Sequence, residues 1–190
     1  MFEVEVKVRA DHEPVREALS EMDASKLETV TQVDTYFDAP HRDFAETDEA
    51  LRLRREQGSA GGKKPRITYK GPLVEEASKT RAEHETAVGS AEAVSKILES
   101  IGFAAAATVK KKRTRFEVGE VTLTLDTVVG LGEFVEVEKT VPESDIEEAR
   151  ESAYDLLREL GLDPETQIRR SYLELVLEDE TGEFRAKEDG

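Results

Sequence analysis

Hydrophobic and polar residues alternate strictly over residues 2–9, which read FEVEVKVR. Successive side chains of a β-strand point to opposite faces, so this period predicts a strand with one apolar and one charged face. The same alternation predicts further strands over residues 33–37, 51–54, 66–70, 81–88, 109–116, 121–126, 134–139 and 170–177. Short glycine-containing turns separate several of them, as is typical of antiparallel neighbours.

Three segments show the helical period instead. A helix is predicted after each of three capping residues, Asp11, Ser90 and Ser144, because apolar residues then recur at three- and four-residue spacing. Gly102 and Gly161 follow the second and third helices as stop signals.

The remaining segments define the expected domain organisation. The glycine-rich run GSAGGKKP at residues 58–65 predicts a mobile loop. Residues 178–190 hold six acidic and two basic residues and predict a flexible acidic tail. We therefore expect a single domain over residues 1–177.

Eight or nine strands with three amphipathic helices predict an α+β fold. A sheet of this size tends to curl or close, which favours an eight-stranded antiparallel closed barrel with the helices packed outside. The charged strand faces would then line the interior. In the alternative, these faces point to solvent and the apolar faces form one ordinary core.

Composition narrows the chemistry. The 190 residues include no Cys, which excludes disulfides, thiolate catalysis and Cys-ligated metal centres, and only three His. The most apolar stretch, residues 101–109, is too short to span a bilayer, and residues 1–9 have no signal-peptide core. We expect a cytoplasmic protein without a membrane partner.

Charge is distributed unevenly. The 27 Lys and Arg against 43 Asp and Glu give a net charge of −16, which argues against nucleic acid as a partner. Residues 51–82 and 110–115 nevertheless carry fourteen basic and three acidic residues, and the rest of the chain carries −27. An acidic coat around a basic patch, with only 12 Lys, suggests adaptation to a salt-rich cytoplasm, as in halophiles.

Residues two apart on a strand share a face with their Cα atoms about 6.5–7 Å apart. Glu-x-Glu therefore aims two carboxylates the same way, and oxygen-only clusters suit Mg²⁺ or Mn²⁺. Rows of Lys and Arg suit phosphate oxygens. Together they predict a site for a metal–polyphosphate complex, and no P-loop or Rossmann motif is present. The acidic pairs are Glu3/Glu5, Glu83/Glu85 and Glu136/Glu138, and the basic sets are Arg52/Arg54, Arg66/Lys70 and Lys111/Arg113/Arg115.

An ordered set of motifs resembles the CYTH superfamily, the triphosphate tunnel metalloenzymes. EVEVK at residues 3–7 looks like the family's ExExK signature, and GLGEFVEVE at 130–138 most resembles the class IV adenylate cyclase branch. Coverage runs from about residue 2 to 177. The other motifs are QVDTYF at 32–37, LRLR at 51–54, TYKGP at 68–72, RAEHE at 81–85, KKR at 111–113, LD at 125–126 and SYLEL at 171–175.

The resemblance implies roles for individual residues around a bound triphosphate and Mg²⁺ or Mn²⁺. Glu83 and Glu85 match a further acidic pair, either for a second metal or to orient basic residues. The implied metal ligands are Glu3, Glu5, Glu136 and Glu138 with Asp126 as a helper; the implied catalytic residues are Glu3, Glu5, Lys7, Glu136 and Glu138; and the implied phosphate-binding residues are Lys7, Arg52, Arg54, Lys70, Arg81, Lys111 and Arg113.

The leading functional prediction is an adenylate cyclase that converts ATP into cyclic AMP and pyrophosphate. The alternative is a triphosphatase acting on thiamine triphosphate, a nucleoside triphosphate or inorganic triphosphate. A non-catalytic module that binds polyphosphate or nucleotide is the third interpretation. A homodimer is implied by the resemblance alone.

Overall fold

The computed structural model describes the backbone of residues 2–58, 61–75 and 80–181, and the side chains of residues 4–58, 61–72 and 82–179. Two predicted site residues, Glu3 and Arg81, therefore have side chains outside the described part, as does the end of the predicted tail, residues 182–190.

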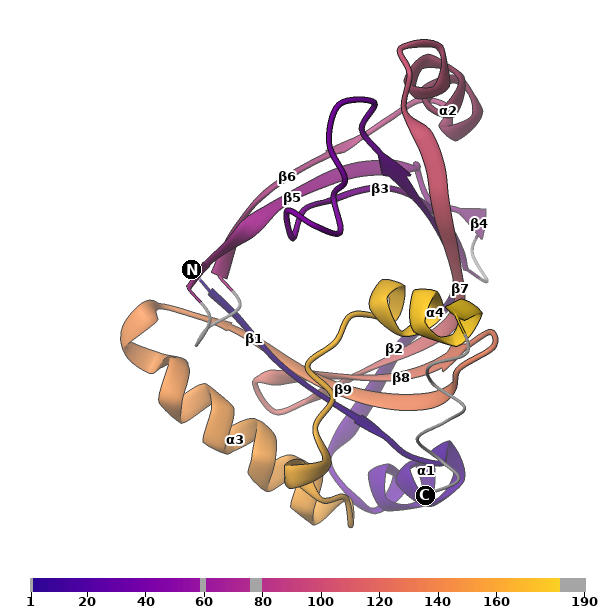
Figure 1. Cartoon of the computed structure of the whole chain (residues 1–190). Helices are drawn as coiled ribbons and strands as arrows, with labels where there is room; N and C mark the ends of the chain where they lie inside the picture. Colours follow the sequence, from indigo (N-terminus) through magenta and orange to yellow (C-terminus); the bar gives the residue numbers. More distant parts are fainter. Residues whose placement is uncertain (1, 59–60, 76–79, 182–190) are drawn as a thin grey trace. The chain divides into compact units, whose positions relative to one another are not determined.

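Eight strands follow one another in the sheet in the order β1-β9-β8-β7-β2-β3-β5-β6, and the two-residue β4 pairs with β3 beside this path (Figure 1). The pairings β1–β9, β8–β9, β2–β3, β3–β5 and β5–β6 are antiparallel. The α+β prediction is confirmed at this level, and closure of the sheet into a barrel stays a prediction. The strands are β1 (Phe2–Arg9), β2 (Ala24–Asp38), β3 (Ala50–Gly58), β4 (Gly61–Gly62), β5 (Arg66–Glu75), β6 (Thr80–Ala87), β7 (Ala104–Val118), β8 (Val121–Val128) and β9 (Gly132–Val141).

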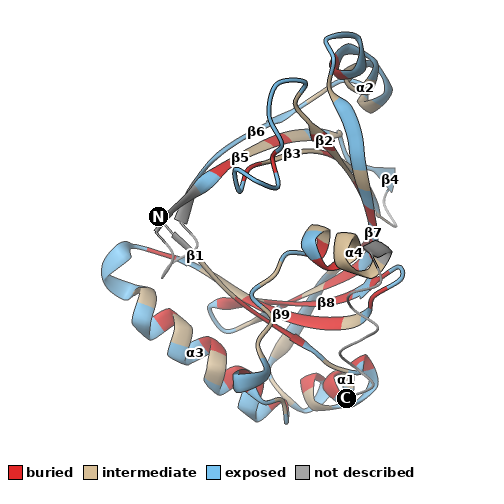
Figure 2. Cartoon of the chain, in the orientation of Figure 1, coloured by how far each residue is buried: buried red, intermediate tan, exposed pale blue. Residues whose placement is uncertain are grey.

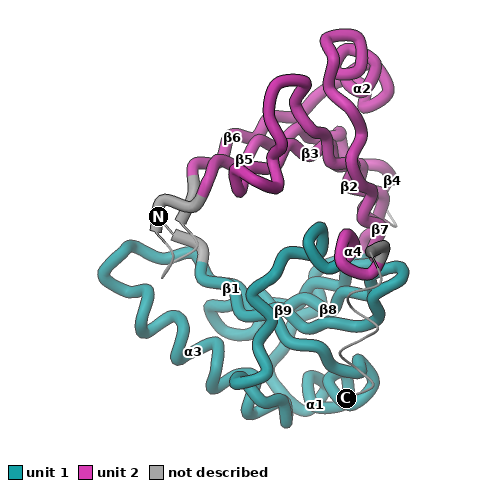
Figure 3. The backbone as a smooth tube through the Cα atoms, viewed as in Figure 1, with its two compact units in different colours: residues 1–29, 112–175 teal, residues 30–111, 176–190 magenta. Residues whose placement is uncertain are grey.

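The chain divides into two compact units (Figure 3). Unit 1 comprises residues 1–29 and 112–175, and unit 2 comprises residues 30–111 and 176–190. The long strands β2 and β7 each contribute one part to each unit.

The core of unit 1 lies between the sheet and two helices, α1 (His12–Glu21) and α3 (Ile146–Glu159). Odd-numbered residues of β8 and β9 and even-numbered residues of β1 supply the apolar side of the sheet, as in Leu123, Val135 and Val6. Leu19 of α1 and Leu157 of α3 pack against them and are 3% and 0% exposed. Figure 2 shows the buried positions along β8, β9 and one side of α3. Because strand side chains alternate, the charged residues of these strands lie on the opposite face.

Unit 2 repeats this arrangement with α2 (Ala91–Ser100). Phe37 of β2, Leu53 of β3 and Leu98 of α2 form its buried cluster. Leu53 therefore faces the helix, and its neighbours Arg52 and Arg54 face the other way.

The three predicted helices are present. Ser90 caps α2 by accepting a hydrogen bond from the backbone N–H of Ala93 at 3.2 Å. Gly102 follows α2 with φ +97°, and a Cβ there would lie 3.1 Å from Cβ of Pro40. The predicted end of the helix at Gly102 is confirmed, because a residue with a side chain rarely adopts this positive φ and would have little space here.

The strand predicted over residues 170–177 is wrong, because this segment forms helix α4 (Tyr172–Thr181). Ser171 Oγ accepts from the backbone N–H of Glu174 at 3.2 Å, and the Glu174 carboxylate accepts from the backbone N–H of Ser171 at 2.6 Å. This reciprocal capping box starts a helix, and Tyr172 and Leu175 then share its buried side. In this segment the Ser-x-x-Glu motif at residues 171–174 predicts the secondary structure better than the alternation of apolar residues does.

One other segment differs in part from expectation. Within the predicted loop 58–65, Gly61 and Gly62 pair with Gly58 and Gln57 of β3, so part of this segment is strand. Residue 177, the predicted end of the domain, lies within α4, and the domain boundary stays a prediction. Among the residues that the structure describes, no helix is both long and apolar enough to cross a membrane.

Candidate functional site

In unit 1 the charged face of the sheet centres on Lys7, which is 4% exposed. Its Nζ lies 3.6 Å from a carboxylate oxygen of Glu5 on the same strand and 3.6 Å from one of Glu136, which stands opposite on β9. Buried ions are costly unless they are paired, so the alternative of a solvent-facing charged surface fails for Lys7 and Glu136, which are 4% and 3% exposed.

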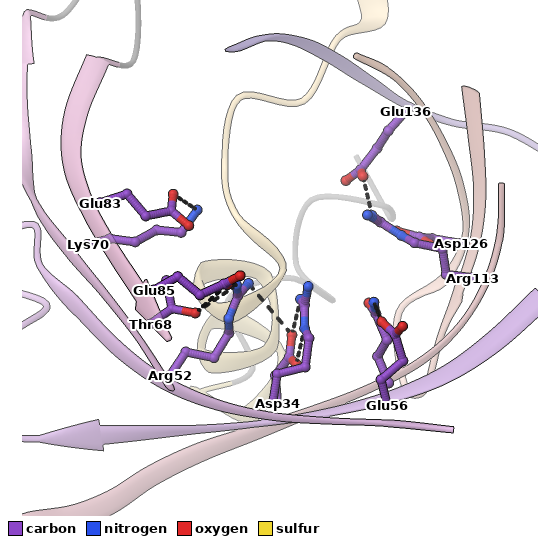
Figure 4. A network of polar contacts seen from close by, with 12 residues as sticks. Asp34, Arg52, Glu56, Thr68, Lys70, Glu83, Glu85, Arg113, Asp126 and Glu136 are labelled. Atoms are coloured by element: carbon purple, nitrogen blue, oxygen red, sulfur yellow. Dashed lines mark hydrogen bonds and ion pairs between the residues drawn. The ribbon is translucent and has the colours of Figure 1, made fainter. Parts of the chain in front are cut away.

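Arg113 of β7 forms the second centre of this face. Its guanidinium donates to both carboxylate oxygens of Asp126, with Nε 2.7 Å from Oδ1, and Nη2 also donates to Glu136 (Figure 4). Asp126 and Glu136 are 0% and 3% exposed. Burial opposes the charged form of Arg113, but Glu136 and Asp126 outweigh it and raise the pKa of Arg113 well above its ordinary value.

This face carries more acid than base. Glu5 stands directly opposite Glu138 across the β1–β9 pair, and like charges in this position destabilise a sheet. The cluster comprises four carboxylates and two cations, an excess of negative charge that a divalent cation would balance. Its members are Glu5, Lys7, Arg113, Asp126, Glu136 and Glu138. In the part of the chain with described side chains, no three or more Asp, Glu or His side chains lie close enough together to act as metal ligands.

Tyr172 is a residue of this cluster to which the sequence analysis assigned no role. Its ring lies 4.4 Å from Lys7 Nζ and meets the ring of Phe134 edge-on at 5.1 Å. Burial, with Glu136 and Asp126 nearby, raises the pKa of Tyr172 well above its ordinary value. The contact between Tyr172 and Lys7 was not expected, because residues 170–177 were predicted as a strand.

In unit 2 the corresponding face centres on Asp34, which is 2% exposed. Arg54, directly opposite on β3, donates to both of its oxygens, with Nε–Oδ1 at 2.7 Å and Nη2–Oδ2 at 2.6 Å. Arg52 Nη1 lies 4.0 Å from Oδ2. Burial raises the pKa of the Asp34 carboxyl, but the hydrogen bond from Arg54 and the charges of Arg54, Arg52 and Lys111 outweigh it and hold the pKa below its ordinary value.

The pair Glu83/Glu85 on β6 faces basic residues of β5 and β3. Lys70 Nζ lies 3.1 Å from Glu83 (Figure 4). Arg66 Nη1 lies 2.8 Å from Glu85. Thr68, which is fully buried, donates to Glu85 at 2.8 Å. These contacts favour the orienting role over a second metal site.

The basic residues outnumber the acidic ones on this face, which is the reverse of unit 1. The buried Nε of Arg52 has no hydrogen-bond acceptor among the described residues. Because this donor lies in a cluster of basic residues, a phosphate oxygen would be a suitable acceptor for it. The five basic residues are Arg52, Arg54, Arg66, Lys70 and Lys111, against Asp34, Glu83 and Glu85; Glu56 adds one further pair with Lys63 at 2.7 Å.

The structure thus gathers the predicted site residues into two clusters, each within one unit. Glu5, Lys7, Arg113, Asp126, Glu136 and Glu138 belong to unit 1, and Arg52, Arg54, Lys70, Glu83, Glu85 and Lys111 to unit 2. Asp34 was not among the predicted site residues. It lies on the polar face of the predicted strand 33–37, and this position could have suggested a basic partner such as Arg54.

Known proteins resemble this chain over most of its length. The CYTH domain family matches residues 1–172. "Putative adenylate cyclase MJ0240" of Methanocaldococcus jannaschii is 37% identical over 92% of this chain and 98% of its own length. Adenylate cyclase CyaB of Aeromonas hydrophila is 31% identical over 90% of this chain and 86% of its own length.

A solved structure shows the same fold. The PH1819 protein from Pyrococcus horikoshii OT3 superposes with a TM-score of 0.83 and 39% identity, covering 94% of this chain and 99% of that one. The family match over residues 1–172 and these full-length similarities show that the chain belongs to the CYTH domain family.

Proposed function

We propose that this protein is a metal-dependent enzyme acting on a triphosphate, most specifically an adenylate cyclase that converts ATP into cyclic AMP and pyrophosphate. The observation that carries the proposal is the opposite charge balance of the two clusters: excess carboxylate around Lys7 and excess Arg and Lys around Asp34. The adenylate cyclase names of the two relatives support ATP as the substrate. The closed barrel predicted from the sequence is part of this proposal.

The carboxylates of unit 1 would hold Mg²⁺ or Mn²⁺. Glu5, Glu136 and Glu138, with Glu3 two residues before Glu5 on β1, offer the oxygen ligands that these ions prefer. Both oxygens of Asp126 accept hydrogen bonds from Arg113, so Asp126 is better suited to holding that arginine than to binding metal directly.

The basic residues would bind the phosphates. Arg54 is held in a bidentate contact by Asp34, and Arg52 is aligned by Thr68 at 3.4 Å and Glu85 at 3.8 Å. These carboxylates restrict the arginine side chains before the substrate arrives, which lowers the entropy cost of binding.

In the cyclase reaction the ribose 3′-oxygen forms a bond to the α-phosphorus and loses its proton to solvent, and the bond from the α-phosphorus to the bridging oxygen of pyrophosphate breaks. The bound metal would lower the pKa of the attacking hydroxyl and offset charge on the phosphates. Lys7 and Arg113 would orient the phosphates and stabilise the negative charge that accumulates on the departing pyrophosphate.

The alternative is a triphosphatase, in which water attacks the γ-phosphate. The same carboxylates and basic residues would serve it, because the two reactions share the triphosphate and differ in the attacking oxygen. The product decides between them: incubation with ATP and Mg²⁺ or Mn²⁺ should yield cyclic AMP and pyrophosphate. Orthophosphate with ADP would establish the hydrolase instead, and no turnover of any triphosphate would refute both.

A carboxylate variant tests the metal assignment. Glu138→Gln removes one charge of the facing pair, so we expect turnover to fall at least about a hundredfold while the melting temperature stays equal or rises. Glu120→Gln is the matched control, because Glu120 lies on a turn of the same unit with an 84% exposed side chain. Full activity in Glu138→Gln would contradict the assignment.

A further inference from the structure

Lys7 contacts an aromatic ring whose role, given the function proposed above, is to position its ammonium group. Tyr172 is the first residue of α4 and is 8% exposed. Its ring faces the ammonium group of Lys7 at 4.4 Å from the ring centroid, within the range of a cation–π interaction.

The other contacts of Lys7 attract its ammonium group without fixing its direction. Both ion pairs, to Glu5 and to Glu136, have N–O distances of 3.6 Å, which is longer than a hydrogen bond. A lysine side chain has a flexible four-carbon stem, so two such attractions leave the nitrogen room to move. The ring adds a surface on a third side and thereby defines its position.

The ring is itself held from two directions. Phe134, which is fully buried, meets it edge-on with an interplanar angle of 69°. The capping box of Ser171 and Glu174 fixes the start of α4, where the ring is attached. Just before it, the backbone N–H of Ile168 donates to the carbonyl of Lys7 at 2.7 Å, so the segment leading to Tyr172 is joined to the residue that the ring contacts.

We propose that Tyr172 is a positioning residue whose ring holds the Lys7 ammonium group in place for a phosphate oxygen of the substrate. A ring face attracts a cation without carrying a full negative charge. It can therefore orient Lys7 while leaving the charge available to phosphate, which a third carboxylate would not.

Two substitutions separate the ring from the hydroxyl. Tyr172→Phe keeps the ring face and should retain kcat within about twofold, whereas Tyr172→Leu removes it and should lower kcat about tenfold. KM should change less than kcat, because Lys7 is needed most as charge develops on the leaving group.

A spectroscopic measurement checks the contact without any substrate. In protein labelled with ¹³C at the lysine ε-carbons, the ring current of Tyr172 should shift the Lys7 ε-methylene protons upfield, and Lys7→Arg identifies the resonance by its loss. The shift should persist in Tyr172→Phe and disappear in Tyr172→Leu. Leu173→Ala, a half-buried neighbour on the same helix, is the control for a loosened α4 and should keep both the shift and the activity.

Each result decides the proposal. Wild-type kcat in a folded Tyr172→Leu whose Lys7 resonance has moved would overturn it, as would an equal loss in the Phe variant. If the wild type turns over no triphosphate, the proposed function fails by itself. Calorimetric binding of Mg²⁺ and tripolyphosphate then decides the positioning role, which requires weaker affinity in the Leu variant than in the wild type and the Phe variant.

Discussion

At the scale of single residues, two buried aspartates each bind the guanidinium group of one arginine. Asp34 and Asp126 each accept two hydrogen bonds from one guanidinium, of Arg54 and Arg113 respectively. Such a pair costs desolvation free energy and adds little net stability, but the loss of one partner leaves a buried uncompensated charge. The pairs therefore serve orientation more than stability.

Asp34 yields a prediction about pH. Its pKa is lower in the folded protein than in the unfolded chain, so its contribution to the free energy of unfolding is present at neutral pH and is lost as pH falls through the folded-state value. Asp34→Asn should cost about 2 kcal/mol at pH 7, and the gap to the wild type should narrow as pH falls below the ordinary Asp pKa of about 3.9 and close only below the folded-state pKa.

Urea unfolding between pH 3 and pH 7 measures this gap, and KM for ATP should rise in the same variant because Arg54 loses its anchor. Asp155→Asn removes an exposed pair with Arg158 on α3 and is the control, with no such pH dependence expected. A gap that stays constant with pH would contradict the role of the Asp34 charge.

At the scale of elements, α4 shows how a short local signal selects structure. The segment has apolar residues at alternating positions, yet Tyr172 and Leu175 are the buried ones, at 8% and 1% exposed, and their spacing is helical. The capping box satisfies two backbone N–H groups that a strand would leave to a neighbour. The helix then brings Tyr172 to Lys7.

The capping box should carry measurable stability. Ser171→Ala should cost about 1 kcal/mol and lower the melting temperature by about 2–4 °C, because the N–H of Glu174 loses its acceptor. Ser95→Ala on α2, whose hydroxyl donates to the side chain of Glu99 on an exposed surface, should change it less. In a double-mutant cycle, Ser171→Ala and Glu174→Gln should be less than additive; strict additivity would show that the box is not cooperative.

At the scale of the whole molecule, the net charge of −16 and the basic clusters belong to different parts of the chain. Basic residues are concentrated in the sheet positions of unit 2 described above, and much of the acidic excess lies on exposed helices and turns. Self-repulsion of this coat should destabilise the compact state at low ionic strength.

The melting temperature should accordingly rise between about 0.01 M and 1 M KCl, where the Debye length falls from about 30 to about 3 Å. Replacing four exposed glutamates, Glu46, Glu117, Glu151 and Glu159, by Gln should flatten this dependence, since it removes a quarter of the net charge. Differential scanning calorimetry on both proteins makes the comparison, and identical melting at all salt concentrations would refute the salt-adaptation hypothesis.

The sequence by itself determined which residues share a face. Strand alternation is a local property, so it predicted eight of the strands, the apolar faces that the helices cover, and the Glu and Arg rows opposite them. The tertiary structure alone decided which charges meet: register placed Glu5 against Glu138 and Asp34 against Arg54, and Asp34 is buried. Partners across strands depend on long-range pairing that no local period encodes, which is why Asp34 and Tyr172 were found only in the fold.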